Sequence, residues 1–183
     1  MKYMSTLLSP LGELLLGSDG EHLTDLRFMG QKHFPDISSH ISAPALSVFA
    51  NTKQWLQDYF SGLRPDPKAL PLSPAGSDFQ RRVWALLAEI PYGETVTYGE
   101  LAMRLGSSAR AVGGAVGRNP ISIILPCHRV LGAGGALTGF DGGIDKKIWL
   151  LRHEGAHFQL RELFRAVFSA IYQKTLDIYR PPI

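Results

Sequence analysis

Short apolar segments separated by turn residues occupy the beginning of the chain. They lie at residues 3–8, 13–16 and 23–28. The Asp19–Gly20 pair between the second and the third segment is typical of a β-hairpin turn. This pattern predicts three short strands in a small antiparallel sheet.

The hydrophobic pattern then changes to a helical period. Apolar residues recur at three- and four-residue steps through residues 45–61, and Gly62 ends the run. Residues 63–75 contain four prolines, each of which fixes φ and removes a backbone donor, so this stretch is neither helix nor central strand. We therefore expect residues 1–75 to form an N-terminal α/β domain, in which a helix covers the sheet, followed by a Pro-rich linker.

Helix start signals recur after the linker. Ser77 opens one capping box, and Thr97 with Glu100 forms a second. The helix after Thr97 is followed by a Gly-containing turn at 106–108 and by a short helix at 109–116, which is a helix-turn-helix pattern. The pattern alone leaves two interpretations open, since the same motif serves both DNA binding and plain packing.

Together with the remaining segments, this pattern predicts an α+β fold. Residues 121–125 form a buried strand or core segment, residues 132–143 a glycine-rich loop, and residues 145–153 a helix. We expect residues 76–156 to be a mainly helical, winged-helix-like domain. Residues 157–183 repeat apolar positions at helical steps and predict an amphipathic helical extension.

Composition narrows the class of protein. Of 183 residues, 45% are hydrophobic and 19% charged, an ordinary globular balance. The apolar runs are too short to cross a bilayer and no secretory signal opens the chain, so we expect a cytoplasmic protein without a membrane partner. A single cysteine excludes an internal disulfide and a Cys-rich zinc site, and the six histidines show no metal-ligand spacing.

Charge is distributed unevenly along the chain. Residues 1–79 hold 6 Lys or Arg against 8 Asp or Glu, whereas residues 80–183 hold 13 against 8. The C-terminal half is therefore the basic half, where contacts to a nucleic acid are expected. Chance solvation of helix faces explains the same numbers equally well.

The residues next to the single cysteine, Cys127, are unusual for a cysteine that only packs in a core. A free cysteine is by default a small buried hydrophobe, but His128 and Arg129 follow this one and favour a thiolate. Consecutive residues point apart on a strand or a helix, so His128 would need a bridging water or a turn to act as a base. Glu154 lies in the last turn of its helix, where a carboxylate is disfavoured. It is either solvated surface or a group that orients a histidine.

Several blocks, in order, give the second half of the chain a recognisable signature. They are Ile90–Glu94, Thr97–Ala102, Ala109–Gly113, Arg118–Pro120, Pro126–Val130 and Leu150–Gly155. Over about residues 78–155 the chain closely resembles the O6-alkylguanine-DNA alkyltransferase family. The resemblance is looser over the N-terminal 75 residues.

This resemblance implies direct, single-turnover DNA repair. A helix-turn-helix would bind double-stranded DNA through the minor groove, and the damaged base would rotate out of the stack. Cys127 would then take the alkyl group of O6-alkylguanine as a thioether, with O4-alkylthymine as a further candidate substrate. The resemblance implies no cofactor and no metal, and we expect the protein to act as a monomer.

The resemblance also assigns roles to particular residues. Cys127 matches the nucleophile, and His128 would take its proton through a water. Glu154 would orient His128, and Asn119 would hold the turn near the cysteine. Tyr98 would donate its hydroxyl to the guanine and stabilise the departing anion.

Further residues match the DNA contacts and the pocket. Arg110 would fill the place of the flipped base, although the turn before it is about two residues shorter than usual. Small residues would lie against the groove, namely Ala111, Gly113, Gly114 and Ala115. The substrate pocket would be formed around Arg129, Val130, Phe140 and Asp141. Phe140 stands where a tyrosine is common, so a hydroxyl contact is lost there.

Three other functions compete with repair. A binding-only relative would lack the acceptor cysteine, so Cys127 argues against it. The hypothesis of a helix-turn-helix regulator does not explain a set of residues outside the motif, namely Cys127, His128, Glu154 and Asn119. A cysteine hydrolase would need an oxyanion hole, and adjacent Cys and His suit its chemistry poorly.

Overall fold

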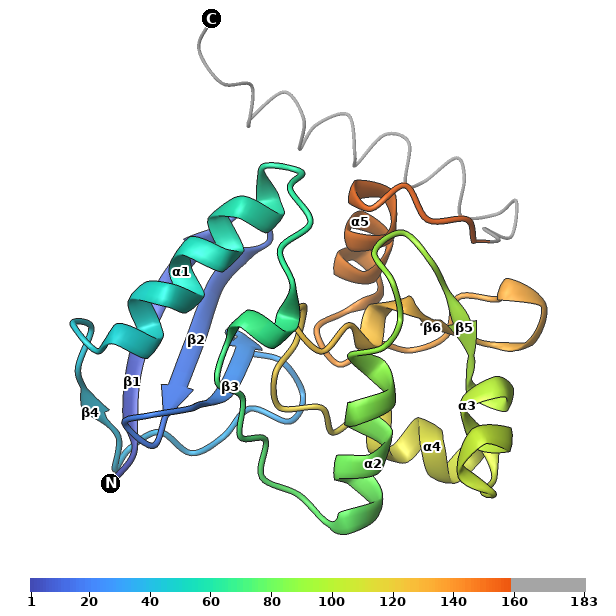
Figure 1. Ribbon diagram of the computed structural model, residues 1–183, viewed down its shortest axis with the longest axis horizontal. Coiled ribbons are helices and arrows are strands. Elements are labelled where there is room, and N and C mark those ends of the chain that lie inside the picture. The colour runs from blue at the N-terminus through green and yellow to red at the C-terminus, as the bar shows by residue number, and fades with distance from the viewer. Residues whose placement is uncertain (159–183) are drawn as a thin grey trace, which may run out of the picture.

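The first part of the chain forms a four-stranded sheet. The computed structural model describes residues 1–158. The strands are β1 (Tyr3–Ser9), β2 (Gly12–Ser18), β3 (Leu23–Phe28) and β4 (Ile41–Ser42), in the order β3-β2-β1-β4 (Figure 1). The three predicted strands are confirmed and run antiparallel. β4 was not predicted, because two exposed residues leave no pattern, and it pairs parallel to β1.

One helix covers this sheet, as the helical period predicted. α1 (Ser47–Phe60) lies across one face of the strands in Figure 1. Its buried side chains include Phe49 and Leu56, which are fully enclosed with Leu14 and Leu16 of β2. Burying a large apolar side chain contributes about 1.5–3 kcal/mol, so this contact holds the helix on the sheet.

The Pro-rich linker is tied to the sheet. It contains the single turn η1 (Pro67–Ala69). The backbone N–H of Leu23 donates to Pro71 O at 2.8 Å, and Ser73 N donates to Leu23 O at 2.9 Å. The linker therefore lies along the outer edge of β3 and satisfies backbone groups that an edge strand would otherwise expose.

Short helices follow. They are α2 (Asp78–Leu87), α3 (Tyr98–Leu105) and α4 (Ala109–Val116), all towards the lower right of Figure 1. Both capping boxes are present, at Ser77 and at Thr97. Gly106 ends α3 with φ of 59°, a conformation that favours glycine, so the predicted helix-turn-helix is confirmed.

The last described elements surround the cysteine. η2 (Cys127–Arg129) leads into β6 (Val130–Leu131), which pairs parallel with β5 (Val96–Thr97). η3 (Ala133–Gly135) and α5 (Ile144–His153) complete the described part.

The two alternatives left open for residues 121–125 are decided. These residues are a buried core segment made mainly of turns, and not a strand. A single isolated bridge joins Ile121 to Leu26, because the following turn leads the chain away from β3.

The two halves of the chain share one hydrophobic core. Leu26 N donates to Pro120 O at 2.9 Å, and Ser122 N donates back to Leu26 O at 2.8 Å. β3 is therefore hydrogen-bonded to the segment that approaches Cys127. None of the helices within residues 1–158 is long and apolar enough to cross a membrane. The predicted helical extension lies outside the described residues from residue 159 onward.

Candidate active site

The turn that presents Cys127 is built around Asn119. The Asn119 amide donates to Leu125 O at 2.7 Å and to Ile121 O at 3.3 Å, and its oxygen accepts from Ile121 N at 3.0 Å. Between these anchors Ile123 has φ of 69°, the one positive φ of a non-glycine residue among residues 1–158. Such a conformation costs about 1–3 kcal/mol and persists only when its surroundings enforce it. Asn119 thus fixes the backbone that leads into Cys127.

His128 is fully buried and faces a carboxylate. Its Nε2 lies 2.7 Å from Glu154 Oε1, and both side chains have no exposed surface. An ionised carboxylate only accepts hydrogen bonds, so Nε2 carries the hydrogen and Nδ1 of the neutral ring is left as an acceptor. Nδ1 is buried and has no hydrogen-bond partner among the described residues. The ring is therefore held in the tautomer of a general base.

Glu154 is surrounded by hydrogen-bond donors. Besides His128, Arg129 donates to it twice, from Nε at 2.7 Å and from the terminal nitrogen Nη2 at 2.9 Å. Tyr59 of α1 donates its hydroxyl at 2.7 Å, and Gly93 its backbone N–H at 3.3 Å. The carboxylate is satisfied on both oxygens, which is the condition for a buried charge to be tolerated.

The titration of this pair follows from its surroundings. Burial lowers the pKa of His128, although the Glu154 carboxylate opposes the shift. Burial acts to raise the pKa of Glu154, but the His128 imidazole and the Arg129 guanidinium hold it well below its usual range. Near neutral pH the histidine is neutral and the glutamate is ionised.

The Cys127 thiol is not a resting thiolate. Burial raises its pKa, and the side-chain hydrogen bond with Asn119 and the nearby ammonium of Lys147 offset only part of that shift. We expected His128 and Arg129 to favour the thiolate directly, but Arg129 is engaged by Glu154. The thiol therefore has to lose its proton when it reacts, which requires a base nearby.

A buried lysine that the sequence analysis did not single out lies beside the thiol. Lys147 of α5 is fully buried, and its Nζ donates to Val130 O at 2.6 Å. Burial lowers its pKa to about 8, against the influence of Cys127. The ammonium is thus placed where it favours a thiolate form of Cys127.

Replacing Lys147 by methionine is expected to raise the pKa of the Cys127 thiol. The loss of a buried positive charge that acts on the sulfur should disfavour the thiolate, so the thiol should ionise only at a higher pH. Labelling of Cys127 by iodoacetamide across a pH series measures this pKa, since the chain has no other cysteine. Lys68→Met, in the exposed linker, serves as the control. An unchanged labelling profile for Lys147→Met would show that the ammonium does not act on the thiol.

A small cavity opens in front of the sulfur. It measures about 60 Å³. Its lining comes from α3, α4, the Asn119 turn and the glycine-rich loop, namely Tyr98, Gly113, Val116, Gly117, Asn119, Ser122, Cys127, Gly139, Phe140 and Asp141. Burial raises the pKa of Tyr98, so its hydroxyl stays protonated and can donate a hydrogen bond into this space.

Comparison with known proteins matches both halves of the chain. The DNA-binding domain of 6-O-methylguanine DNA methyltransferase matches residues 78–156, and the ribonuclease-like domain of the same methyltransferase matches residues 2–74. The chain belongs to the 6-O-methylguanine DNA methyltransferase family.

Individual relatives in this methyltransferase family are similar over most of their length. The methylated-DNA–protein-cysteine methyltransferase of Haemophilus influenzae is 46% identical over 83% of this chain and 86% of its own. The methylated-DNA–protein-cysteine methyltransferase of Methanosarcina acetivorans is 44% identical over 84% of this chain and 99% of its own. The crystal structure of Mycobacterium tuberculosis OGT in complex with DNA has a TM-score of 0.77 at 46% identity, over 83% of this chain and 92% of that one.

The fold brings most of the residues matched to the methyltransferase signature to one place. Tyr98, Asn119, Phe140 and Asp141 line the cavity with Cys127. His128 and Glu154 form the hydrogen-bonded pair behind it.

Two residues assigned to the methyltransferase pocket lie elsewhere. Arg129 donates to Glu154 and to Ile90 O, and its guanidinium stands 5.7 Å from the centroid of the Tyr92 ring. Val130 is fully buried, and its carbonyl oxygen accepts a hydrogen bond from Lys147 Nζ. Neither lines the Cys127 cavity. Arg129 supplies the cation that the buried Glu154 carboxylate requires, and Val130 belongs to the hydrophobic core.

The residues assigned to DNA contacts are divided by the orientation of α4. Arg110 and Ala111 are exposed in its first turn, and Gly113 lines the cavity. Ala115 instead is 3% exposed, and its carbonyl accepts from Trp84 Nε1 at 2.9 Å. Ala115 therefore belongs to the packing face of the helix, together with the buried Val112 and Val116.

Proposed function

We propose that this protein repairs double-stranded DNA by transferring the alkyl group of O6-alkylguanine to Cys127, once per protein molecule. The observation that supports the proposal is the buried His128–Glu154 pair in a chain of this family. His128 directly follows Cys127, the only cysteine, and its Nδ1 has no hydrogen-bond partner among the described residues. The cavity lined by Cys127, Tyr98 and Phe140 supports the entry of a flipped base beside the sulfur. No cofactor enters the reaction.

The transfer needs one proton movement and one displacement. His128 Nδ1 takes the thiol proton through one bridging water. The sulfur attacks the alkyl carbon, and the bond from that carbon to guanine O6 breaks with its electron pair on the guanine. Tyr98 donates a hydrogen bond to the departing guanine anion. The proton that His128 took from the thiol is then returned through water to the guanine, which leaves as the neutral base. Cys127 keeps the alkyl group as a thioether, and no water attacks it further, so the protein is spent.

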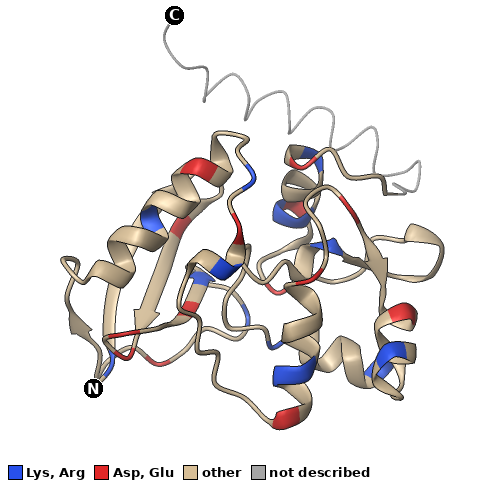
Figure 2. Cartoon of the chain, viewed as in Figure 1, with Lys and Arg blue, Asp and Glu red and all other residues tan. Residues whose placement is uncertain are grey.

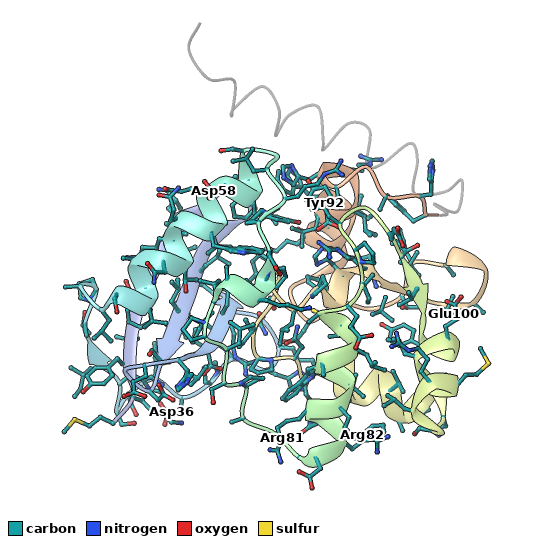
Figure 3. All side chains as sticks on the ribbon, viewed as in Figure 1. Asp36, Asp58, Arg81, Arg82, Tyr92 and Glu100 are labelled. Carbon is teal, nitrogen blue, oxygen red and sulfur yellow. The ribbon has the colours of Figure 1, made fainter. Side chains whose placement is uncertain are left out.

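The DNA-binding surface is proposed to be the exposed side of α3 and α4, meeting the minor groove. Lys and Arg residues stand on α2 and α3 at this end of the molecule (Figure 2). Arg82 projects outward from α2 (Figure 3), and Arg110 and Arg118 are exposed on and just after α4. Arg110 would fill the stack behind the flipped base, which lowers the cost of flipping. One chain supplies every group of the site, which supports action as a monomer.

Mass spectrometry tests this proposal directly. The protein is incubated with duplex DNA carrying O6-methylguanine, and the peptide that contains Cys127 is weighed. We expect a gain of one methyl group per protein, no further turnover, and unmodified guanine in the DNA. Binding of the duplex without a mass change would favour a regulator instead, and repeated turnover would favour a hydrolase.

A further inference from the structure

The loop that forms one wall of the Cys127 cavity has little structure of its own. Gly139, Phe140 and Asp141 line the cavity. Within residues 139–143 a single backbone hydrogen bond occurs, from Gly143 N to Phe140 O at 3.0 Å. Three of these five residues are glycines, which leave the backbone conformationally free. A wall of this kind depends on outside contacts to keep one position.

Those contacts come from the other half of the chain. Gln31 and His33 follow β3, more than a hundred residues before the loop. Gln31 Nε2 donates to Asp141 Oδ2 at 2.6 Å, and His33 N donates to the same oxygen at 3.2 Å. His33 Nδ1 lies 2.6 Å from Asp141 Oδ1. Both carboxylate oxygens of a cavity residue are thus held by the segment after β3.

The segment that holds Asp141 is itself rigidly placed. Gln31 is buried, and its Oε1 accepts from Phe28 N at 2.9 Å. The Phe28 ring packs edge-on against Phe140, with centroids 6.2 Å apart. A Cβ added to Gly142 would lie 2.6 Å from the Phe28 ring, so the loop fits closely against β3. The buried end of β3 therefore provides a fixed reference for the loop.

We infer that Gln31 and His33 are positioning residues for alkyl transfer, which act through Asp141 by holding the cavity wall against Cys127. The inference rests on the proposed function. On this inference the N-terminal part of the chain helps to position the reacting groups. Such positioning affects the rate, because a reacting group displaced by about 1 Å can slow the reaction about a hundredfold.

Single-turnover kinetics test the inference. His33→Ala is expected to lower the limiting rate of methyl transfer about tenfold, with the dissociation constant for unmodified duplex and the melting temperature unchanged. His33→Asn is expected to recover most of the rate, because its amide nitrogen can replace Nδ1 as donor to Asp141. A purely structural role would change the melting temperature without this separation. An unchanged or faster limiting rate for His33→Ala would overturn the inference.

A double-mutant cycle shows whether His33 acts through Asp141. In an Asp141→Ala background, His33→Ala should change the rate less than twofold, since its partner is already gone. His22→Ala is the matched control, because it removes a comparable pair, His22 with Asp19 at 3.3 Å, from the same half of the chain. Equal effects of His33→Ala in both backgrounds would contradict the coupling.

A measurement that needs no DNA separates this inference from the proposed function. Loosening the wall should expose the thiol, which is 7% exposed in the intact chain. His33→Ala should therefore speed iodoacetamide labelling of Cys127 several-fold. If the wild type transfers no methyl group, the proposed function fails, and the labelling result still decides whether the contact holds the wall. Labelling as slow as in the wild type would overturn the inference on its own.

Discussion

Cys127→Ser is expected to abolish methyl transfer while leaving DNA binding intact. A serine hydroxyl is a far weaker nucleophile than a thiol at neutral pH, and nothing in the site ionises it, so the rate should fall more than about a thousandfold. The intact mass of the variant, after incubation with duplex carrying O6-methylguanine, should show no added methyl group. Electrophoretic mobility shift should show an affinity for the duplex close to that of the wild type.

The small size of this substitution makes it informative. Cys127 packs among buried residues, and serine is nearly isosteric, so the melting temperature should change by only a few degrees. Ser122, a cavity-lining residue that already carries a hydroxyl, provides a control as Ser122→Ala. That variant should still gain one methyl group. A Cys127→Ser protein that removes methyl groups at the wild-type rate would refute the proposed function.

Local signals in the sequence predicted the part of the site that depends on neighbouring residues. Capping boxes placed Thr97, and so Tyr98, at the start of a helix, because the box is closed within one turn. Glu154 was noticed because a carboxylate at a helix C-terminus is unfavourable. The fold gives the reason for its placement, since the Arg129 guanidinium balances its charge and His128 donates a hydrogen bond to it.

The groups that the sequence did not reveal act across long separations. Lys147 stands in a charged stretch that is typical of a surface, and only the packing of α5 against β6 shows it to be buried. Tyr59 reaches Glu154 across 95 residues, and Gln31 reaches Asp141 across 110. No periodicity records such pairs. β5 and β6 also escaped prediction, because two residues each are too few to form an alternating pattern.

The second large effect is expected at Glu154. Glu154→Gln leaves the guanidinium of Arg129 and the ring of His128 buried without a negative partner. Breaking a buried ion pair in this way costs about 3–5 kcal/mol, so urea denaturation should show a loss of that size. The rate of methyl transfer should also fall about a hundredfold or more, because a neutral amide no longer fixes which imidazole nitrogen carries the hydrogen.

Tyr59→Phe is the matched control for this variant. It removes one hydrogen bond from an uncharged donor to the same carboxylate, at 2.7 Å, and keeps the ring stacked on Trp55. Its cost should be about 1.5–3 kcal/mol, the range for hydrogen bonds to charged groups, with the charge of Glu154 preserved. Equal losses of stability in Glu154→Gln and Tyr59→Phe would mean that the charge of Glu154 contributes nothing beyond a hydrogen bond.

The pH dependence of stability separates the two members of the pair. The folded-state pKa of His128 lies below its ordinary value of 6.5, so its contribution is complete above that pH and declines as the unfolded chain takes up a proton below it. The folded-state pKa of Glu154 lies below 4.5, so its contribution is complete above that value and is lost on further acidification.

Wild-type stability should therefore fall in two stages from about pH 6.5 downward. Glu154→Gln should lose the share of Glu154 in the stage below pH 4.5 and keep the stage that begins near pH 6.5, because glutamine has no proton to gain. The carboxylates of Asp19, Asp36 and Glu100, whose pKa values are also lowered by hydrogen bonds, account for the rest of the acid stage. A variant that retained the full acid-side loss below pH 4.5 would show that other carboxylates, and not Glu154, determine the acid stability of the fold.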